Sequence, residues 1–323
     1  MKIEDILVCL EDLVWKDEMT LVEDNGLVTH VKPEEDGRML REIIYGRLRL
    51  SRGLLRRMKS GGGVYLNGQP AYITQRGRSG DELAITFADS QSAVQPEAIP
   101  LDIVYEDAHV LVVNKPVGMA VHPTRTYPNG TLANGIAALW EARGYERRVR
   151  LMHRLDRETS GLLIIAKEPY AYQRLSLQFQ DRTLQRHYLA VVAGNLGTVS
   201  GTISEPIGRR LGGSGHSLRR AVVSDGKAAI THYRLVQQYQ GCSLVQLALE
   251  TGRTHQIRVH MAWLGHPLVG DEMYGGPTDW FPRQALHAYA MDFTHPRTGE
   301  MIHLHALIPA DMKRLLQERK IQR

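Results

Sequence analysis

Hydrophobic and polar positions alternate in two different ways along the chain, and the change comes near residue 100. Before it, short apolar runs have the spacing of small helices and strands. Ser51 is a residue type that caps helices, and Asn67-Gly68 is typical of a two-residue hairpin turn. The predicted elements are helices over 38–45 and from 51 onward, and strands over 64–66 and 83–87. This pattern predicts a small α/β domain over residues 38–90, after an N-terminal extension over 1–37.

The second pattern starts after a polar, proline-containing linker at 88–100. Short β-rich runs then alternate with turns, and the hydrophobic period switches between two and 3.6 without a regular βαβ order. Strands are expected over 101–105, 110–114, 161–166, 187–193, 230–237 and 243–249, and helices over 131–143, 169–180 and 255–264. We therefore predict an α+β domain over 91–323, built on a mainly antiparallel or mixed sheet with flanking helices.

The composition is that of an ordinary globular protein. Of the 323 residues, 43% are hydrophobic and 23% are charged, which allows a sizeable core. No run of about 18 apolar residues occurs, so no membrane span is expected. Acidic residues interrupt the first apolar positions, which argues against a secretory signal. Cys9 and Cys242 are expected to be buried thiols, which fits the reducing cytoplasm.

Charge is distributed unevenly near the N-terminus. Residues 1–40 hold eleven acids against four bases, whereas residues 41–80 hold nine bases against one acid, Glu42. Such a change within one small region favours a basic face that meets a polyanion. A solvated surface with counter-charges supplied by the fold is the alternative interpretation. The formal net charge of +5 agrees with either.

The histidines do not form a recognisable metal motif. The chain has 14 of them but no HExxH and no CxxC. His255 and His260 are five positions apart, which is a poor spacing for one helical face. The G-x-x-x-x-G-K-[ST] phosphate loop is missing too. We therefore predict neither a metal nor a cofactor.

The segment His153-Arg154-Leu155-Asp156-Arg157-Glu158-Thr159-Ser160-Gly161 is the strongest candidate for chemistry. Its charged residues lead into the apolar run 162–166, which must be buried. A loop held by a buried strand is rigid, and a rigid loop suits a catalytic carboxylate. The residues alone leave two roles open for Asp156, a salt-bridge partner or a nucleophile.

This segment resembles the signature of the RluA family of pseudouridine synthases. Three further segments are similar to that family in the same order, and the resemblance covers roughly residues 99–310. They are Asn114-Lys115-Pro116-Val117-Gly118-Met119-Ala120-Val121-His122-Pro123, Arg186-His187-Tyr188-Leu189-Ala190-Val191-Val192-Ala193-Gly194, and Leu249-Glu250-Thr251-Gly252-Arg253-Thr254-His255-Gln256-Ile257-Arg258-Val259-His260 with the Gly270-Asp271 that follows.

The resemblance implies a role for four residues. Asp156 would be the catalytic nucleophile, and Arg154 would take the place of the everted base. Tyr188 would lie under the target uracil, and Arg258 would pair with Asp156. Arg186 stands where the family usually has lysine, so the positive charge is kept. These roles agree with chemistry, because a stacked base must be extruded before it can react, and a guanidinium keeps a carboxylate ionised in a dry pocket.

The implied reaction is an isomerisation and needs no cofactor. The N1–C1′ bond of uridine breaks, the uracil turns, and C5 joins C1′. A positioned carboxylate is an established covalent nucleophile. Attack at C1′, addition at C6 and deprotonation at C2′ through a glycal all remain open at this point.

The stretch SRGLLRRMKSGGGVYLNGQ resembles an S4-like RNA-binding module. By this resemblance, the bases Arg52, Arg56, Arg57 and Lys59 would contact RNA phosphates. The expected partner is therefore RNA, either ribosomal or transfer RNA, with a tendency toward the large ribosomal subunit. We expect a monomer.

Two other functions compete with this one. The first is an RNA-binding protein that keeps the fold but has lost activity, although such a protein has no need of Asp156, Tyr188 and Arg258 together. The second is a hydrolase with Asp156 and Glu158 as paired carboxylates, as in glycosidases.

Overall fold

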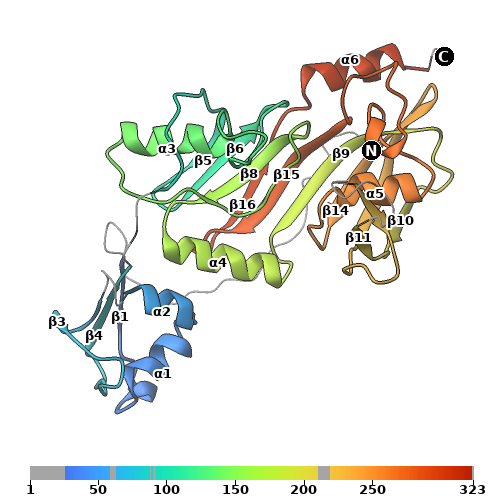
Figure 1. Cartoon of the computed structure of the whole chain (residues 1–323). Coiled ribbons are helices and arrows are strands. Elements are labelled where there is room, and N and C mark those ends of the chain that lie inside the picture. The colour runs from blue at the N-terminus through green and yellow to red at the C-terminus, as the bar shows by residue number, and fades with distance from the viewer. Residues whose placement is uncertain (1–25, 59–62, 88, 90–91, 210–218, 322–323) are drawn as a thin grey trace. The chain divides into compact units, whose positions relative to one another are not determined.

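The computed structural model describes residues 26–58, 63–87, 89, 92–209 and 219–321. These residues form two compact units. The smaller one runs up to residue 87 and includes 294–301, and the larger one comprises the rest from residue 89 (Figure 1). The predicted extension lies outside the described residues up to position 25, and no helix in the described part is long and apolar enough to cross a bilayer.

The smaller unit is built on a four-stranded sheet with the order β1-β4-β2-β3. Its elements are β1 (Gly26–His30), η2 (Pro33–Glu35), α1 (Leu40–Tyr45), α2 (Arg52–Met58), β2 (Val64–Leu66), β3 (Gln69–Pro70) and β4 (Glu82–Thr86). Because β1 pairs with β4, residues 26–37 belong to this unit and not to an extension. Asn67 and Gly68 both have positive φ, 51° and 76°, which is the conformation that the predicted hairpin turn requires.

A buried ion pair fixes the start of this unit. Arg47 donates from Nε to Glu35 Oε1 at 2.8 Å and from Nη2 to Oε2 at 3.0 Å. Arg47 Nη1 also donates to Thr29 Oγ1 at 2.9 Å, and Glu35 is only 5% exposed. Two parallel hydrogen bonds of this kind hold both side chains in one geometry.

The larger unit contains a ten-stranded sheet with the main order β10-β13-β14-β9-β15-β8-β6-β5, to which β16 and β7 add at β15 and β8. Its strands are β5 (Ile103–Glu106), β6 (Val110–Lys115), β7 (Arg150–Leu151), β8 (Ser160–Ala166), β9 (Gln185–Ala193), β10 (Ser200–Ile203), β13 (Thr231–Tyr239), β14 (Cys242–Leu249), β15 (Leu286–Thr294) and β16 (Met301–His305). Along the main order only β15 and β8 are parallel neighbours. This confirms the predicted α+β class with a mainly antiparallel, mixed sheet.

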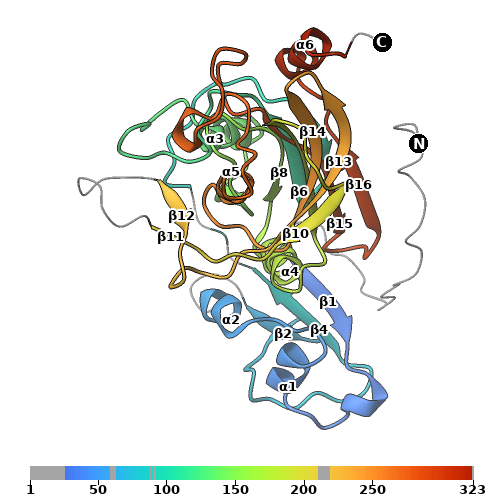
Figure 2. The ribbon, with the colours of Figure 1, turned by 90° about the vertical axis from the view of Figure 1, so that its right-hand side faces the viewer.

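Helices cover both faces of this sheet. They are α3 (Leu132–Ala142), α4 (Pro169–Gln180), α5 (Gln256–Trp263) and α6 (Ala310–Glu318), with η3 (Glu272–Tyr274) and a separate β11 (Ile207–Arg209) and β12 (Arg220–Val222) ribbon. Apolar residues of α3 and α5 share one core with β6, β8, β9 and β14, and both helices lie on the same side in Figure 2. The cores of α4 and α6 use the alternate residues of these strands, so the sheet is buried on both faces.

The strand β8 is buried along its whole length. Its start lies against β15, where Gly161 has a φ of 119° and an added Cβ would lie 2.2 Å from the carbonyl oxygen of Ala288. Only glycine fits this approach. The close parallel pairing therefore fixes where the loop before β8 ends.

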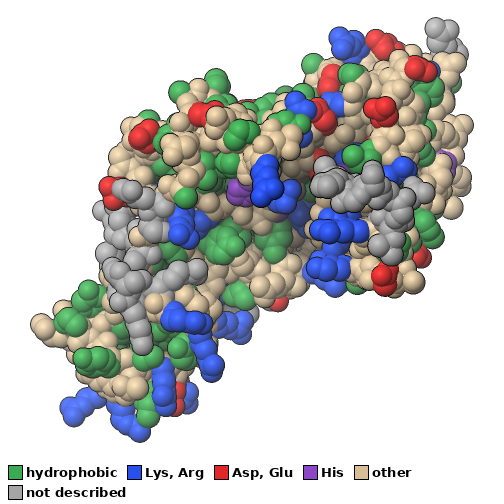
Figure 3. All heavy atoms as spheres, viewed as in Figure 1, with side chains coloured by type: hydrophobic (Ala, Val, Ile, Leu, Met, Phe, Trp, Pro, Cys, Tyr) green, Lys and Arg blue, Asp and Glu red, His purple; other side chains and the backbone are tan. Residues whose placement is uncertain are grey.

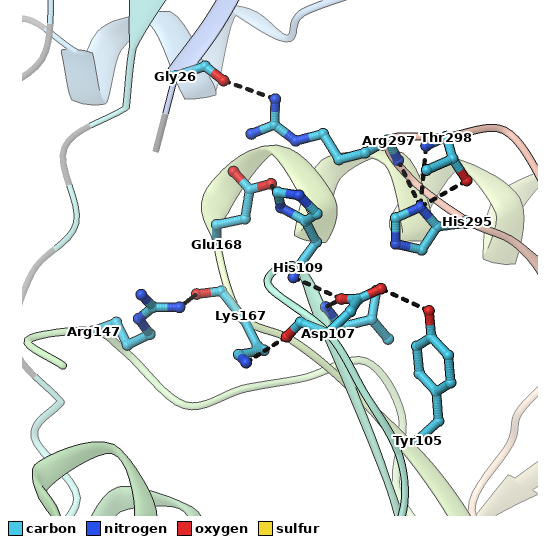
Figure 4. A network of polar contacts seen from close by, with 11 residues as sticks. Gly26, Tyr105, Asp107, His109, Arg147, Lys167, Glu168, His295, Arg297 and Thr298 are labelled. Atoms are coloured by element: carbon cyan, nitrogen blue, oxygen red, sulfur yellow. Dashed lines mark hydrogen bonds and ion pairs between the residues drawn. The ribbon is translucent and has the colours of Figure 1, made fainter. Parts of the chain in front are cut away.

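The turn between β5 and β6 is held by Asp107 (Figure 4). Its Oδ1 accepts from the backbone N–H groups of His109 and Val110, both at 2.7 Å, and its Oδ2 accepts from Tyr105 at 2.7 Å. Lys167 also donates to the Asp107 carbonyl. This network fixes the outer edge of the sheet.

Two side chains of apolar character, Trp263 and Cys242, differ in burial. Trp263 has the apolar character of a core residue, but it lies at the end of α5 and is 53% exposed. Cys242 is a buried free thiol, as expected, whereas Cys9 lies outside the described residues.

Candidate active site

A pocket of about 800 Å³ lies within the larger unit. The loop before β8, the strand β9 and the start of α5 form its walls. Asp156, Arg154, Tyr188 and Arg258 all line it, so the structure brings the four predicted residues to one cavity. Figure 3 shows a hollow on this unit with Lys and Arg side chains at its edge.

Asp156 is held by a charged hydrogen bond. Arg258 Nη1 donates to Asp156 Oδ2 at 2.9 Å. The Asp156 side chain is 28% exposed, so it is partly accessible from the pocket, whereas Arg258 is only 6% exposed. A charge-assisted hydrogen bond of this length fixes the direction of the carboxylate.

Arg258 is itself held by a second carboxylate, Asp271. Arg258 donates from Nε to Asp271 Oδ2 at 2.7 Å and from Nη2 to Oδ1 at 2.9 Å, and Asp271 is 1% exposed. Burial alone would lower the pKa of Arg258, but the hydrogen bonds and charges of Asp271 and Asp156 outweigh it and raise that pKa. The guanidinium therefore stays charged. Asp271 belongs to the Gly270-Asp271 motif, and its sequence context alone predicted no role for it.

His255 and Tyr274 complete this cluster. His255 precedes α5 with left-handed backbone, φ 59°. Its Nδ1 lies 2.9 Å from the Tyr274 hydroxyl and its Nε2 lies 3.8 Å from Asp156 Oδ2. Burial lowers the pKa of His255 despite the nearby Asp156, so the ring is neutral at neutral pH. The spacing of residues in the sequence did not predict a contact between His255 and Tyr274, because only the folded chain brings η3 to the start of α5.

Tyr188 presents a buried ring to the pocket from β9. It is 4% exposed and packs in the core that α3 and α5 share. Burial raises the pKa of Tyr188, so its hydroxyl remains protonated at neutral pH. Arg186, two residues earlier, is 8% exposed and lines the same pocket, with its guanidinium carbon 5.1 Å from the centre of the Phe179 ring.

Arg154 differs from these residues because it is exposed at the pocket. Its side chain makes no hydrogen bond and no ion pair within the described part of the chain. Burial lowers the pKa of His122, and the charge of Arg154 lowers that pKa further. A long cation in this position is able to move with a ligand. Its exposure suits the role that the resemblance implied.

Buried Lys115 holds the loop that carries Asp156. Its side chain is fully buried, and Nζ donates to the carbonyl oxygens of Pro116 at 2.7 Å, Met119 at 2.9 Å and Arg157 at 3.1 Å. Burial lowers the pKa of Lys115 to about 7, although Glu158 and Asp156 oppose the shift. The lysine thus joins two segments that are 42 residues apart.

The alternative of paired carboxylates does not fit the pocket. Glu158 does not line it, and instead Glu158 Oε1 lies 3.3 Å from Arg157 Nη1 in an ion pair. Among the residues that the structure describes, no three His, Cys, Asp or Glu side chains are grouped to hold a metal ion.

The predicted RNA-binding residues of the smaller unit lie on or after α2. Arg52 and Arg56 are exposed on this helix. The side chain of Arg57 and the whole of Lys59 lie outside the described residues.

Comparison with known proteins identifies the family. The model of the family described as RNA pseudouridylate synthase matches residues 109–263. A Bacillus subtilis protein named "Uncharacterized RNA pseudouridine synthase YhcT" is 41% identical over 293 residues, which span 90% of this chain and 96% of that protein. The chain belongs to the RNA pseudouridylate synthase family.

Other members of the family agree with this assignment. The "Ribosomal large subunit pseudouridine synthase D" of Nitrosomonas europaea is 39% identical over 265 residues, or 79% of this chain and 76% of that protein. The solved structure of human RNA Pseudouridylate Synthase Domain Containing 1 covers 65% of this chain and 84% of its own, with 30% identity and a TM-score of 0.54. The resemblance to RluA-type synthases is thereby confirmed. The protein is an isomerase that converts uridine in RNA to pseudouridine.

Proposed function

We propose that this RNA pseudouridine synthase acts through the carboxylate of Asp156 on uridines in structured RNA. The observation that carries the proposal is the 2.9 Å hydrogen bond from Arg258 to Asp156 at the wall of a pocket that Tyr188 also lines. In this proposal a carboxylate held in one direction acts beside a buried aromatic ring. Both groups are accessible to one everted nucleotide.

Each residue has a task in this reaction. Arg154 occupies the position that the flipped uridine leaves, since its exposed guanidinium can stack and contact phosphate. Tyr188 supports the uracil face while the ring turns. Asp156 attacks the nucleoside or removes a proton from it, as the N1–C1′ bond breaks and the C5–C1′ bond forms. C5 loses one proton and N1 gains one, so the isomerisation balances without a redox partner.

The RNA that we favour is that of the large ribosomal subunit. The support comes from the Nitrosomonas europaea relative, whose name specifies that subunit, and from the S4-like arrangement of the smaller unit. In that unit Arg52, Arg56, Arg57 and Lys59 would contact phosphates. Transfer RNA is the alternative substrate. We also propose that the protein is monomeric and cytoplasmic. Size-exclusion chromatography with and without RNA tests whether it is a monomer.

The test uses purified protein with an unmodified large-subunit ribosomal RNA transcript, without added metal or nucleotide. The wild type should form pseudouridine, and Asp156→Asn should abolish turnover while RNA affinity stays within a few-fold. Glu158→Gln is the matched control, because Glu158 lies two residues away and outside the pocket. Turnover in Asp156→Asn would remove Asp156 from its role.

The product that the wild type forms from the transcript also distinguishes the competing functions. An inactive RNA-binding protein of this fold would bind the transcript and leave every uridine unchanged. A hydrolase would release free uracil in place of pseudouridine.

A further inference from the structure

A second pocket, of about 480 Å³, adjoins the active-site pocket. Both are lined by the same three residues, Gly252, Arg253 and Thr254, just before α5. The second pocket is otherwise formed by the ribbon of β11 and β12 and the turn that follows it. Any chain that leaves the active site on this side therefore passes over the ribbon.

The second pocket carries an excess of positive charge. Four cations line it, Arg209, Arg220, Lys227 and Arg253, against the single acid Asp225. None of these five side chains has an ion-pair partner in the described part of the chain. Arg220 Nε is buried there without a hydrogen-bond partner. Four unneutralised cations around one cavity repel each other, and a bound polyanion removes that cost.

The backbone beneath these cations is rigid. Ile207 and Lys227 exchange two backbone hydrogen bonds, each of 2.9 Å. An added Cβ on Gly226 would lie 2.7 Å from the Ile207 carbonyl carbon, so the two segments approach as closely as glycine permits. Arg253 Nε also donates to the Ala228 carbonyl at 3.0 Å. The backbone positions that carry the cations are therefore set before any ligand binds.

The ribbon is also tied to the catalytic cluster. Ile207 and Ala229 pack against Val259 of α5, the helix that carries Arg258. The Arg220 backbone N–H donates to the Tyr274 hydroxyl at 3.0 Å, and that hydroxyl contacts His255 beside Asp156. The distance between the basic pocket and the carboxylate is thus fixed by direct contacts.

We propose that this second pocket binds backbone phosphates of the RNA strand next to the target uridine, an inference that rests on the proposed function. Arginine and lysine side chains are the usual partners of nucleic acid phosphates, and such contacts position a strand without reading its sequence. The site would fix how far the target nucleotide lies from Asp156. This site consists of other residues than the Arg and Lys side chains of the smaller unit that we propose for RNA binding.

The test compares the full-length wild type with the double variant Arg209→Gln/Lys227→Gln. Both side chains are exposed, so the fold should tolerate the change. The probe is a labelled single-stranded oligouridylate, with affinity measured between about 50 and 200 mM salt. Each lost contact lowers the slope of log affinity against log salt by about 0.7. If two contacts are lost, the ratio of wild-type affinity to variant affinity should fall about seven-fold as the salt concentration rises fourfold.

The control is Lys313→Gln/Arg314→Gln, which removes an exposed lysine and an exposed arginine from α6. It should keep the wild-type slope. A ribbon variant with the wild-type slope, or an equal change in the control, would overturn the proposal. Turnover of the wild type on the ribosomal transcript tests the proposed function separately, so the two failures are distinguishable.

Discussion

The contact between Arg258 and Asp271 leads to a quantitative prediction for Asp271→Asn. The substitution keeps the shape of the side chain and removes a charge that is 1% exposed and makes two hydrogen bonds to Arg258. Breaking a buried ion pair costs about 3–5 kcal/mol. We expect the lower end, about 3 kcal/mol, because asparagine keeps one oxygen and Asp156 still accepts from Arg258.

The same change should slow the reaction. A hydrogen bond to a charged group contributes about 1.5–3 kcal/mol, and Asp271 supplies the two that orient the guanidinium toward Asp156. The rate at saturating RNA should therefore fall about 10- to 100-fold. The assay is release of tritium from RNA labelled at uridine C5, together with urea unfolding.

A matched control is Glu35→Gln in the smaller unit. Glu35 is 5% exposed and makes the same two-bond contact, with Arg47, at 2.8 and 3.0 Å. This variant should lose stability and keep the rate at saturating RNA. A destabilised Asp271→Asn variant that reacts at the wild-type rate, or equal slowing of both variants, would refute the orienting role of Asp271.

Three further predictions concern other parts of the chain. Gly161→Ala should prevent folding or strongly lower Tm, because the added Cβ would lie 2.2 Å from the carbonyl oxygen of Ala288. The control Gly197→Ala should leave Tm unchanged, because the added Cβ meets no atom within 4 Å. Equal Tm values for the two variants would contradict this prediction. The pKa of Lys115 is about 7 when folded and 10.5 ordinarily, so the unfolded chain binds more protons between these values and stability rises with pH. Between pH 7 and 9 the free energy of unfolding, measured with urea, should rise by about 2 kcal/mol, and Lys115→Met should lack this rise. An unchanged rise in the variant would exclude Lys115 as its source. Arg56→Glu should weaken RNA binding and flatten its salt dependence in titrations, and unchanged binding would make the basic face of α2 incidental.

Most of the sheet was predictable from local patterns. The strands that became β6, β8 and β9 contain continuous apolar runs, because they are buried on both faces, and the apolar run of β14 is broken only by Gln246 after Ser243. The strand β15 was not predicted, although it lies in the middle of the sheet. Its run LHAYAMDFT contains polar residues, and its place depends on a parallel partner more than 100 residues away.

The site was predictable only in part. The residues alone left Asp156 open between two roles, and its pairing with Arg258 came from the family resemblance. Nothing local connects Asp271 to Arg258, because their contact depends on the turn between α5 and η3. The same reason explains why Tyr274 and the buried role of Lys115 were not foreseen. Contacts across a fold leave no periodic signal in the chain.

The complete burial of β8 ties the loop of the proposed nucleophile to the core of the larger unit. Asp156 lies four residues before a strand with no exposed position, so its loop cannot melt while the sheet remains folded. Heat inactivation should then coincide with cooperative unfolding of the larger unit and not precede it, and β8 amides should exchange with solvent only through that global event.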